Sequence, residues 1–280
     1  MLKYLRADLY KLFKSRTMWI CYAACVVSFI LFSSACYTLP DKDDTFAIIT
    51  HIDCVITVML EYQSVITYAI LLSACLFLSK DYGAKFFKNL PDKGWAARLY
   101  QTLSKVICMI ILIVIMYGLW LGINFVNAAA RYYGEYGMGF FYGVEDLIDE
   151  NSMPMFAINY TVNEWLKADG LYLLLAFAAT MIIMAMAAVF RNGYAVTLTT
   201  LIWSIACPFV FEWIDPLYHD YKTLRHYTVF GGMLRTSDAI IFPKLERDMH
   251  VVDKMIAVSV IAIVVSLLVS WLVTWKREER

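Results

Sequence analysis

The chain has 280 residues, of which 61% are hydrophobic and 17% are charged, and its mean hydropathy is +0.62. A soluble domain is typically about half apolar and about a quarter charged, so this composition excludes an ordinary soluble protein. Lipid is therefore expected to be the solvent for much of the chain. Lys plus Arg and Asp plus Glu balance at 24 each, so the net charge gives no indication of nucleic-acid binding.

Before the first long apolar segment, apolar residues recur with helical spacing and form a single stripe. The stripe consists of Leu2, Leu5, Leu9, Leu12 and Phe13. Lys3, Lys11 and Lys14 lie off the stripe, where they can reach lipid phosphates. Residues 1–17 are therefore predicted to form an amphipathic helix in the inner membrane interface, which either only anchors the protein or also has a further role.

Six segments have the roughly 20 apolar residues that a membrane span needs, with ionisable residues confined to their ends. They are 18–39, 60–79, 103–126, 171–190, 194–213 and 254–275. The apolar segment 46–59 is short and contains His51 and Asp53, which fits a re-entrant or interfacial piece better than a seventh span. The first span is of full length and is expected to be retained, not cleaved as a signal peptide. The sequence thus predicts an all-α, polytopic membrane protein with one transmembrane domain over 1–280.

The distribution of basic residues predicts the orientation of these spans. Lys and Arg concentrate in 1–17, in 80–102 and in the C-terminal KREER, whereas 40–59 and 127–170 are acidic. The chain is expected in the plasma membrane, and the positive-inside rule then predicts that both termini lie in the cytoplasm. The outer segments would be 127–170 and 214–253. The second of these holds five basic residues, but long loops cross with less regard to charge.

The second and third spans are separated by the sequence SKDYGAKFFKNLPDKGWAARLYQTLSK, residues 79–105. Tyr82, Phe86 and Leu90 fall at helical spacing and would form an aromatic ridge, and the Pro91–Gly94 region would end that helix. Aromatic anchors within a charged rim are typical of a protein–protein contact. A lipid-facing interfacial helix that contacts no protein is the alternative.

Two stretches, MLKYLRADLYKLFKSRTMWI and SKDYGAKFFKNLPDKGWAARLYQTLSKVI, resemble the membrane subunit of type-2 ATP-binding-cassette (ABC) transporters. Such permeases show an acidic residue, a Gly-Thr or similar pair, a basic residue and a helix, then a Pro–Arg turn and a Lys. Ala84 stands where Thr is common, and Asp81 where Glu is common. The pattern is filled here by Asp81, Gly83, Lys85, Pro91, Arg98 and Lys105.

The resemblance implies that 80–90 is a coupling helix that docks in a groove of a cytoplasmic ATPase subunit. The residues implied in coupling are Asp81, Tyr82, Gly83, Lys85, Phe86, Phe87, Lys88 and Arg98. It further implies two permease subunits, identical or paralogous, above two ATPase subunits that bind ATP and Mg. The function implied is export of an amphipathic substrate, with a peptide as the first expectation and immunity to an antimicrobial peptide in a bacterium as its context.

Other patterns have two interpretations. Gly118 and Gly122 form a GxxxG pattern that favours close helix packing, either inside this bundle or between subunits. The aromatic segment 131–142 is typical of a headgroup-level belt, or of a contact with departing substrate. Seven cysteines, mostly within apolar segments, are expected to be free thiols. Only Cys36 and Cys54 lie close enough to the outer face for a disulfide to be conceivable.

The sequence contains no GxxxxGK[ST], HExxH or GxSxG motif and no paired His/Cys ligand set, so the chain is not expected to be an enzyme or to hold a metal by itself. No ionisable residue lies near the middle of a predicted span, which argues against an ion-coupled carrier. A non-enzymatic membrane scaffold or assembly protein without an ATPase is the alternative function, and an intramembrane enzyme is a third. The residues that contact substrate cannot be assigned.

Overall fold

The computed structural model describes residues 1–36, 59, 63–79, 94–136, 162–190, 192–214, 228–233 and 251–278, and their regular secondary structure is entirely helical. The described part contains eight helices, in agreement with the predicted all-α class. They are α1 (Leu2–Lys14), α2 (Arg16–Cys36), α4 (Gln63–Ser79), α5 (Trp95–Tyr136), α6 (Val162–Phe190), α7 (Gly193–Ile214), α8 (Val229–Met233) and α10 (Val251–Glu278).

Four helices are long and apolar enough to cross a membrane, over Arg16–Ser34, Trp95–Ala130, Trp165–Phe190 and Val251–Lys276. Helix α4 is apolar but shorter, with 17 residues, and α7, with 22 residues, is not among the four. These helices identify the chain as a helical membrane protein. The finer prediction of six spans goes beyond this finding.

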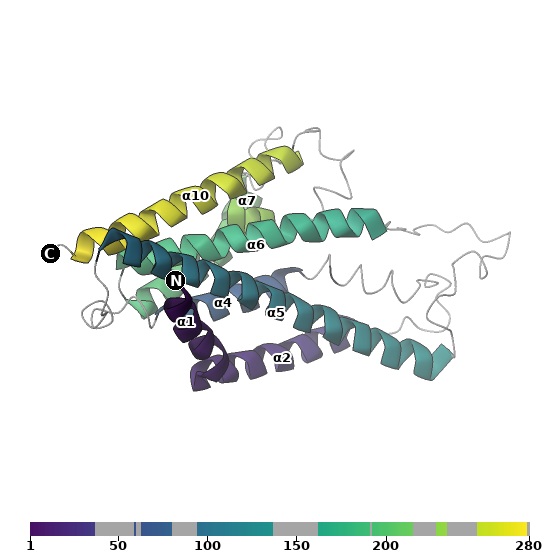
Figure 1. Cartoon of the computed structure of the whole chain (residues 1–280). Helices are drawn as coiled ribbons and strands as arrows, with labels where there is room; N and C mark the ends of the chain where they lie inside the picture. Colours follow the sequence, from purple (N-terminus) through teal and green to yellow (C-terminus); the bar gives the residue numbers. More distant parts are fainter. Residues whose placement is uncertain are drawn as a thin grey trace.

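The long helices lie side by side along a common direction, and α1 crosses them at an angle (Figure 1). The start of α1 and the end of α10 both lie toward the same end of the bundle (Figure 1). Helix α5 has 42 residues, a length of about 63 Å at 1.5 Å per residue. It begins before and ends after the predicted span 103–126, because polar residues at its two ends continue the helix beyond the apolar segment.

Helix α6 lies at the centre of the bundle, where it packs along α10 and also contacts α4, α5, α7 and α8. Small side chains on α6 allow this close approach, since they let helix backbones come together where lipid offers no hydrophobic drive for association. These buried alanines are Ala176, Ala178, Ala179, Ala187 and Ala188. The small buried side chains of α6 therefore fit the position of this helix among its neighbours.

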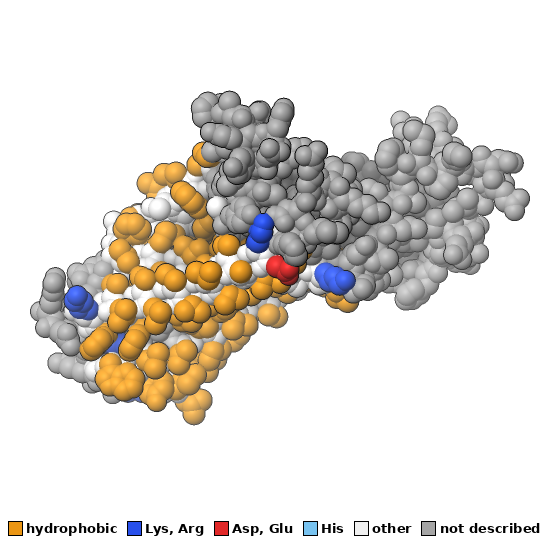
Figure 2. All heavy atoms as spheres, turned by 90° about the horizontal axis from the view of Figure 1, so that it is seen from above, with side chains coloured by type: hydrophobic (Ala, Val, Ile, Leu, Met, Phe, Trp, Pro, Cys, Tyr) orange, Lys and Arg blue, Asp and Glu red, His pale blue; other side chains and the backbone are white. Residues whose placement is uncertain are grey.

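The outer faces of the long helices are apolar. Leu31 of α2, Val114 of α5 and Ile261 of α10 are each more than 60% exposed. Figure 2 shows hydrophobic side chains covering the face that carries α10, with the charged side chains near its borders. A surface of this kind needs a hydrocarbon solvent.

Gly118 and Gly122 lie on the outer surface of α5. A Cβ atom added at either position would meet no atom within 4 Å. Within the described part of the bundle, no helix therefore uses the GxxxG pattern for close packing. The interpretation that these glycines pack inside the bundle has no contact to support it, whereas contact with another subunit is untested.

The end of α4 and the start of α7 are in very close contact. A Cβ atom added to Gly193 would lie 2.5 Å from Cβ of Ser79, which is closer than real Cβ atoms approach. Asn192 begins α7 by accepting a hydrogen bond from the Tyr194 backbone N–H at 3.0 Å. Glycine at 193 is therefore required for α7 to start against the last residue of α4.

We expect Gly193→Ala to lower the free energy of unfolding by about 1–3 kcal/mol, the usual cost of overpacking a contact whose neighbour is close to the backbone. Gly118→Ala is the matched control, because it adds the same methyl group in open space and improves helix propensity by up to about 1 kcal/mol. Chemical denaturation of the purified chain in detergent micelles measures both changes. Equal stability of the two variants would contradict the close contact between α4 and α7.

Candidate functional site

The candidate site lies where α1, the end of α4 and the start of α5 meet, and it flanks the predicted coupling segment on both sides. Gly94 precedes α5 with a φ of +106°, a conformation that glycine adopts at little cost. Its carbonyl accepts a hydrogen bond from the Arg98 backbone N–H at 3.3 Å, so the first turn of α5 begins directly after the segment.

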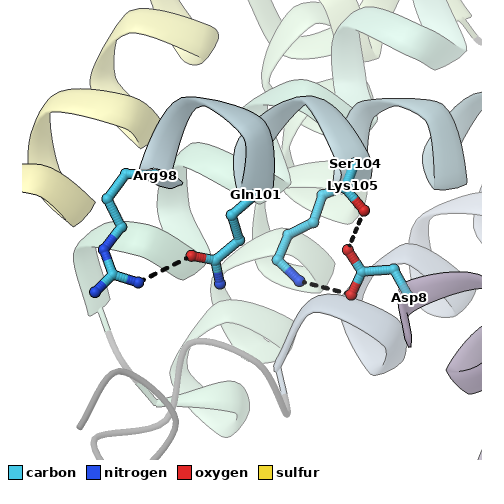
Figure 3. A network of polar contacts seen from close by, with 5 residues as sticks. All are labelled: Asp8, Arg98, Gln101, Ser104 and Lys105. Carbon is cyan, nitrogen blue, oxygen red and sulfur yellow. Dashed lines mark hydrogen bonds and ion pairs between the residues drawn. The ribbon is translucent and has the colours of Figure 1, made fainter. Parts of the chain in front are cut away.

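Asp8 connects α1 to α5. Ser104 Oγ donates a hydrogen bond to Asp8 Oδ2 at 2.5 Å, and Lys105 Nζ donates to Asp8 Oδ1 at 3.4 Å (Figure 3). Lys105 is 1% exposed and Asp8 is 8% exposed. The pair is therefore a buried salt bridge, in which each charge depends on the other for compensation.

Phe77, near the end of α4, brings the third helix into this cluster. Lys105 Nζ lies 5.8 Å from the centroid of the Phe77 ring, and Lys11 Nζ of α1 lies 5.5 Å from it. Both distances fall within the range of a cation–π interaction. One aromatic ring thus contacts cations from α1 and α5.

Arg98 and Gln101 extend the polar face of α5 toward the N-terminal end of the helix. Arg98 Nη1 donates to Gln101 Oε1 at 3.2 Å, and Arg98 is only 2% exposed. The spacing of Arg98, Gln101 and Lys105 places all three on one face of α5, and Figure 3 shows their side chains extending on the same side of that helix. A charged and polar stripe therefore runs from the start of α5 to the contact with α1.

Helix α10 is attached to the same end of α5. Trp271 Nε1 donates to the Trp95 carbonyl at 3.3 Å, and Trp271 stacks with Trp275 at a centroid distance of 6.0 Å. The residues on either side of segment 80–93 therefore contact different helices. The α7 start packs against Ser79 on one side, and α1 and α10 contact α5 on the other.

The structure places only part of the predicted site. Arg98 and Lys105 lie at the start of α5 and are buried, whereas the other predicted coupling residues lie outside the described residues. These are Asp81, Tyr82, Gly83, Lys85, Phe86, Phe87 and Lys88. Pro91, which belongs to the same resemblance, also lies outside them.

The predicted interfacial stripe on α1 is divided between the bundle and the exterior. Leu12 is fully buried, and Leu5 and Leu9 are partly buried against the core. Leu2 is 81% exposed and Phe13 is 44% exposed. Part of the stripe therefore packs on the protein, while the rest remains available to lipid.

Sequence reasoning did not identify Asp8, Ser104 or Phe77 as site residues. A signal was present, since Asp8 stands within the apolar stripe, between Leu5 and Leu12 at helical spacing. An acidic residue on an otherwise apolar face favours a buried partner, which here is Lys105.

A second group of polar contacts lies nearer the start of α4 and the second half of α5, and it also involves α2 and α6. Tyr117 donates a hydrogen bond to Asp169, Thr67 bonds Tyr172, and Ser33 donates to Asn124. Asp169 was assigned to the outer segment 127–170, but the structure places it within the apolar stretch Trp165–Phe190, where it is 6% exposed. These contacts link α2, α4, α5 and α6, and a structural role in helix association explains them.

The side chains of four of the seven cysteines are described, and all four are free and buried, as predicted: Cys21, Cys25, Cys75 and Cys108. The suggested pairing of Cys36 with Cys54 falls outside what the structure describes. Among the described residues, no group of three or more His, Cys, Asp or Glu side chains is placed to hold a metal ion.

No protein-family model, no curated protein and no solved structure matches this chain. The resemblance to ABC permeases therefore rests on the sequence patterns alone, and the arrangement of buried charges has to be interpreted from its own chemistry.

We expect Asp8→Asn to destabilise the protein by roughly 3 kcal/mol, because it leaves a buried Lys105 ammonium without the Asp8 carboxylate. Arg6→Gln is the control, since it removes a charge from the exposed side of the same helix and should change stability by at most about 0.5 kcal/mol. Denaturation of the purified chain in detergent measures both variants.

The double variant Asp8→Asn with Lys105→Met removes both charges and should recover most of the loss. A double variant no more stable than Asp8→Asn alone would show that the ion pair is not the source of the effect.

Proposed function

We propose that this chain is the permease subunit of an ABC exporter. A separate ATPase subunit binds and hydrolyses ATP with Mg, and the permease moves an amphipathic substrate, a peptide, out of the cell. The sequence pattern around 80–105 supports this proposal. The chain itself is not an enzyme under this proposal.

The observation that carries the proposal is the set of contacts at the two ends of segment 80–93. Ser79 packs against Gly193 of α7, and the first turns of α5 contact α1 through Asp8 and α10 through Trp271. A force applied to the segment would therefore reach three helices besides the two that it connects. A coupling element needs rigid connections of this kind to a set of helices that move together.

The proposal includes six spans, with α4 and α7 as the second and fifth, and with both termini in the cytoplasm of a bacterial cell. The basic residues of α1 and of 80–102 support this orientation through the positive-inside rule. The position of the start of α1 and the end of α10 toward one end of the bundle is compatible with an even number of crossings (Figure 1). Two permease subunits, identical or paralogous, would assemble above two ATPases.

Crosslinking from the proposed coupling segment tests the proposal. Single cysteines replace Phe86 or Phe87 in a variant without the seven native cysteines, and membranes of the native host are crosslinked and analysed by mass spectrometry. We expect crosslinks to an ATPase whose yield changes with nucleotide, because closure of the ATPases would move the docked helix. A cysteine at Leu166 is the control, since this residue is 58% exposed near the start of α6, at the end of that helix away from the turn to α7 and from the segment.

Crosslinks from Phe86→Cys and Phe87→Cys to lipid alone, with no ATPase recovered, would overturn the exporter proposal. They would favour the membrane scaffold, which needs no ATPase. Equal nucleotide-dependent crosslinking from Leu166→Cys would show that the crosslinks do not depend on position, and would contradict a specific docking role for the segment.

A further inference from the structure

An apolar groove of about 580 Å³ runs along the outer surface between α2 and α4. Ile20, Ala24 and Phe32 line it from α2, and Val65, Leu72 and Leu76 line it from α4. From Thr17 to Phe32 the groove follows α2 for about 22 Å, at 1.5 Å per residue. It is open along its side, so in a bilayer it faces the hydrocarbon.

The volume and shape of the groove fit one acyl chain. A methylene group occupies about the volume of a water molecule, roughly 30 Å³, so the groove holds on the order of 20 of them. One leaflet contributes about half of the roughly 30 Å hydrocarbon core. The groove is longer than that half, so an acyl chain can lie along it through the whole depth of one leaflet. A helix of about 10 Å diameter along the same length would need roughly 1,700 Å³, and could lie only over the groove and not in it.

The junction of α1 and α2 marks the level of the headgroups at one end of the groove. Tyr10, Phe13 and Trp19 are exposed there, and Trp19 Nε1 donates to the Phe13 carbonyl at 2.8 Å, which fixes the angle between the two helices. Exposed aromatic side chains of this kind gather at the membrane–water interface. An acyl chain that enters at Thr17 would therefore have its headgroup beside this junction.

Basic residues at the same junction determine which headgroup fits. Lys14 ends α1 and Arg16 begins α2, and both residues are exposed. In the sequence they lie within three positions of Thr17, the first residue of α2 that lines the groove. Two cations beside the phosphate favour a lipid with net negative charge over a zwitterionic one. We propose that the groove between α2 and α4 binds one acyl chain of an anionic phospholipid, with Lys14 and Arg16 contacting its headgroup. This proposal does not depend on an ATPase partner.

Photocrosslinking of the full chain tests the groove. The chain is placed in phosphatidylcholine nanodiscs that contain a small fraction of phosphatidylglycerol with a diazirine in one acyl chain, and adducts are located by mass spectrometry. We expect adducts to concentrate on the groove residues of α2 and α4, above the level found on exposed α10 residues such as Ile261. Ala24→Phe fills the groove and should lower the groove adducts to the α10 level.

Ala23→Phe is the matched control, because Ala23 is the adjacent exposed alanine of α2 and does not line the groove. It should leave the adducts unchanged. If Ala24→Phe fails to fold, Leu72→Trp fills the groove from α4 and should have the same effect. Equal amounts of groove adduct in Ala23→Phe and in the groove-filling variants would overturn the proposal. Equal labelling of α2 and α10 would also overturn it, because it would show only the lipid that surrounds the whole protein.

The headgroup is tested separately with Lys14→Gln and Arg16→Gln. A phosphatidylcholine carrying the same diazirine chain provides the comparison, and each substitution should lower the preference for phosphatidylglycerol by roughly fivefold. Lys167→Gln, which removes an exposed charge near the start of α6, should leave the preference unchanged. An unchanged preference in all three variants would overturn the headgroup assignment. Crosslinks from groove residues to a second copy of the chain would identify the occupant as protein and overturn the lipid.

Discussion

The buried ion pair of Asp8 and Lys105 constrains the rest of this structure. A charge removed from water costs several kcal/mol unless its partner and further hydrogen bonds are well placed. Ser104 supplies such a bond to Asp8, and the Phe77 ring faces the Lys105 ammonium. Because both charges are nearly inaccessible to water, α1 cannot leave α5 without exposing or abandoning one of them. The N-terminal helix is therefore a component of the bundle as well as a membrane-surface element.

The same pair determines how the ends of α4 and α5 are held. Phe77 lies in the last turn of α4, and Lys105 lies in the third turn of α5, so the cluster holds both helices close to the segment that connects them. Gly193 fixes the last residue of α4 against α7 from the opposite side. Helix α10 adds the hydrogen bond from Trp271 to the first residue of α5. A displacement at this end of the bundle would have to move these helices together or break these contacts.

Sequence patterns predicted the helical membrane class, because the apolar segments are long and the ionisable residues avoid them. They predicted helix limits less well, since polar residues at the ends of α5 and α6 continue the backbone helix beyond the apolar segment. The GxxxG pattern indicates that close packing is possible, but not which face of α5 meets another helix, and Gly118 lies on the outside. Of the candidate site, Arg98 and Lys105 were predicted from a motif. Asp8 can be found from its place within the apolar stripe of α1, but its partner Lys105 can be assigned only once the structure shows which side of α1 faces α5.

Helix α1 has two chemically different sides, and the two proposals depend on different ones. The side with Asp8 and Leu12 is buried on the bundle, where its contacts resist any relative motion of α1 and α5. The other side and its junction with α2 carry exposed aromatic residues and the cations Lys14 and Arg16, which suit a headgroup layer. Because the junction is continuous with α2, the depth at which lipid holds α1 also fixes the depth of the α2–α4 groove. The buried ion pair then fixes the depth of α5, so the membrane surface and the start of α5 are placed relative to each other by one short helix.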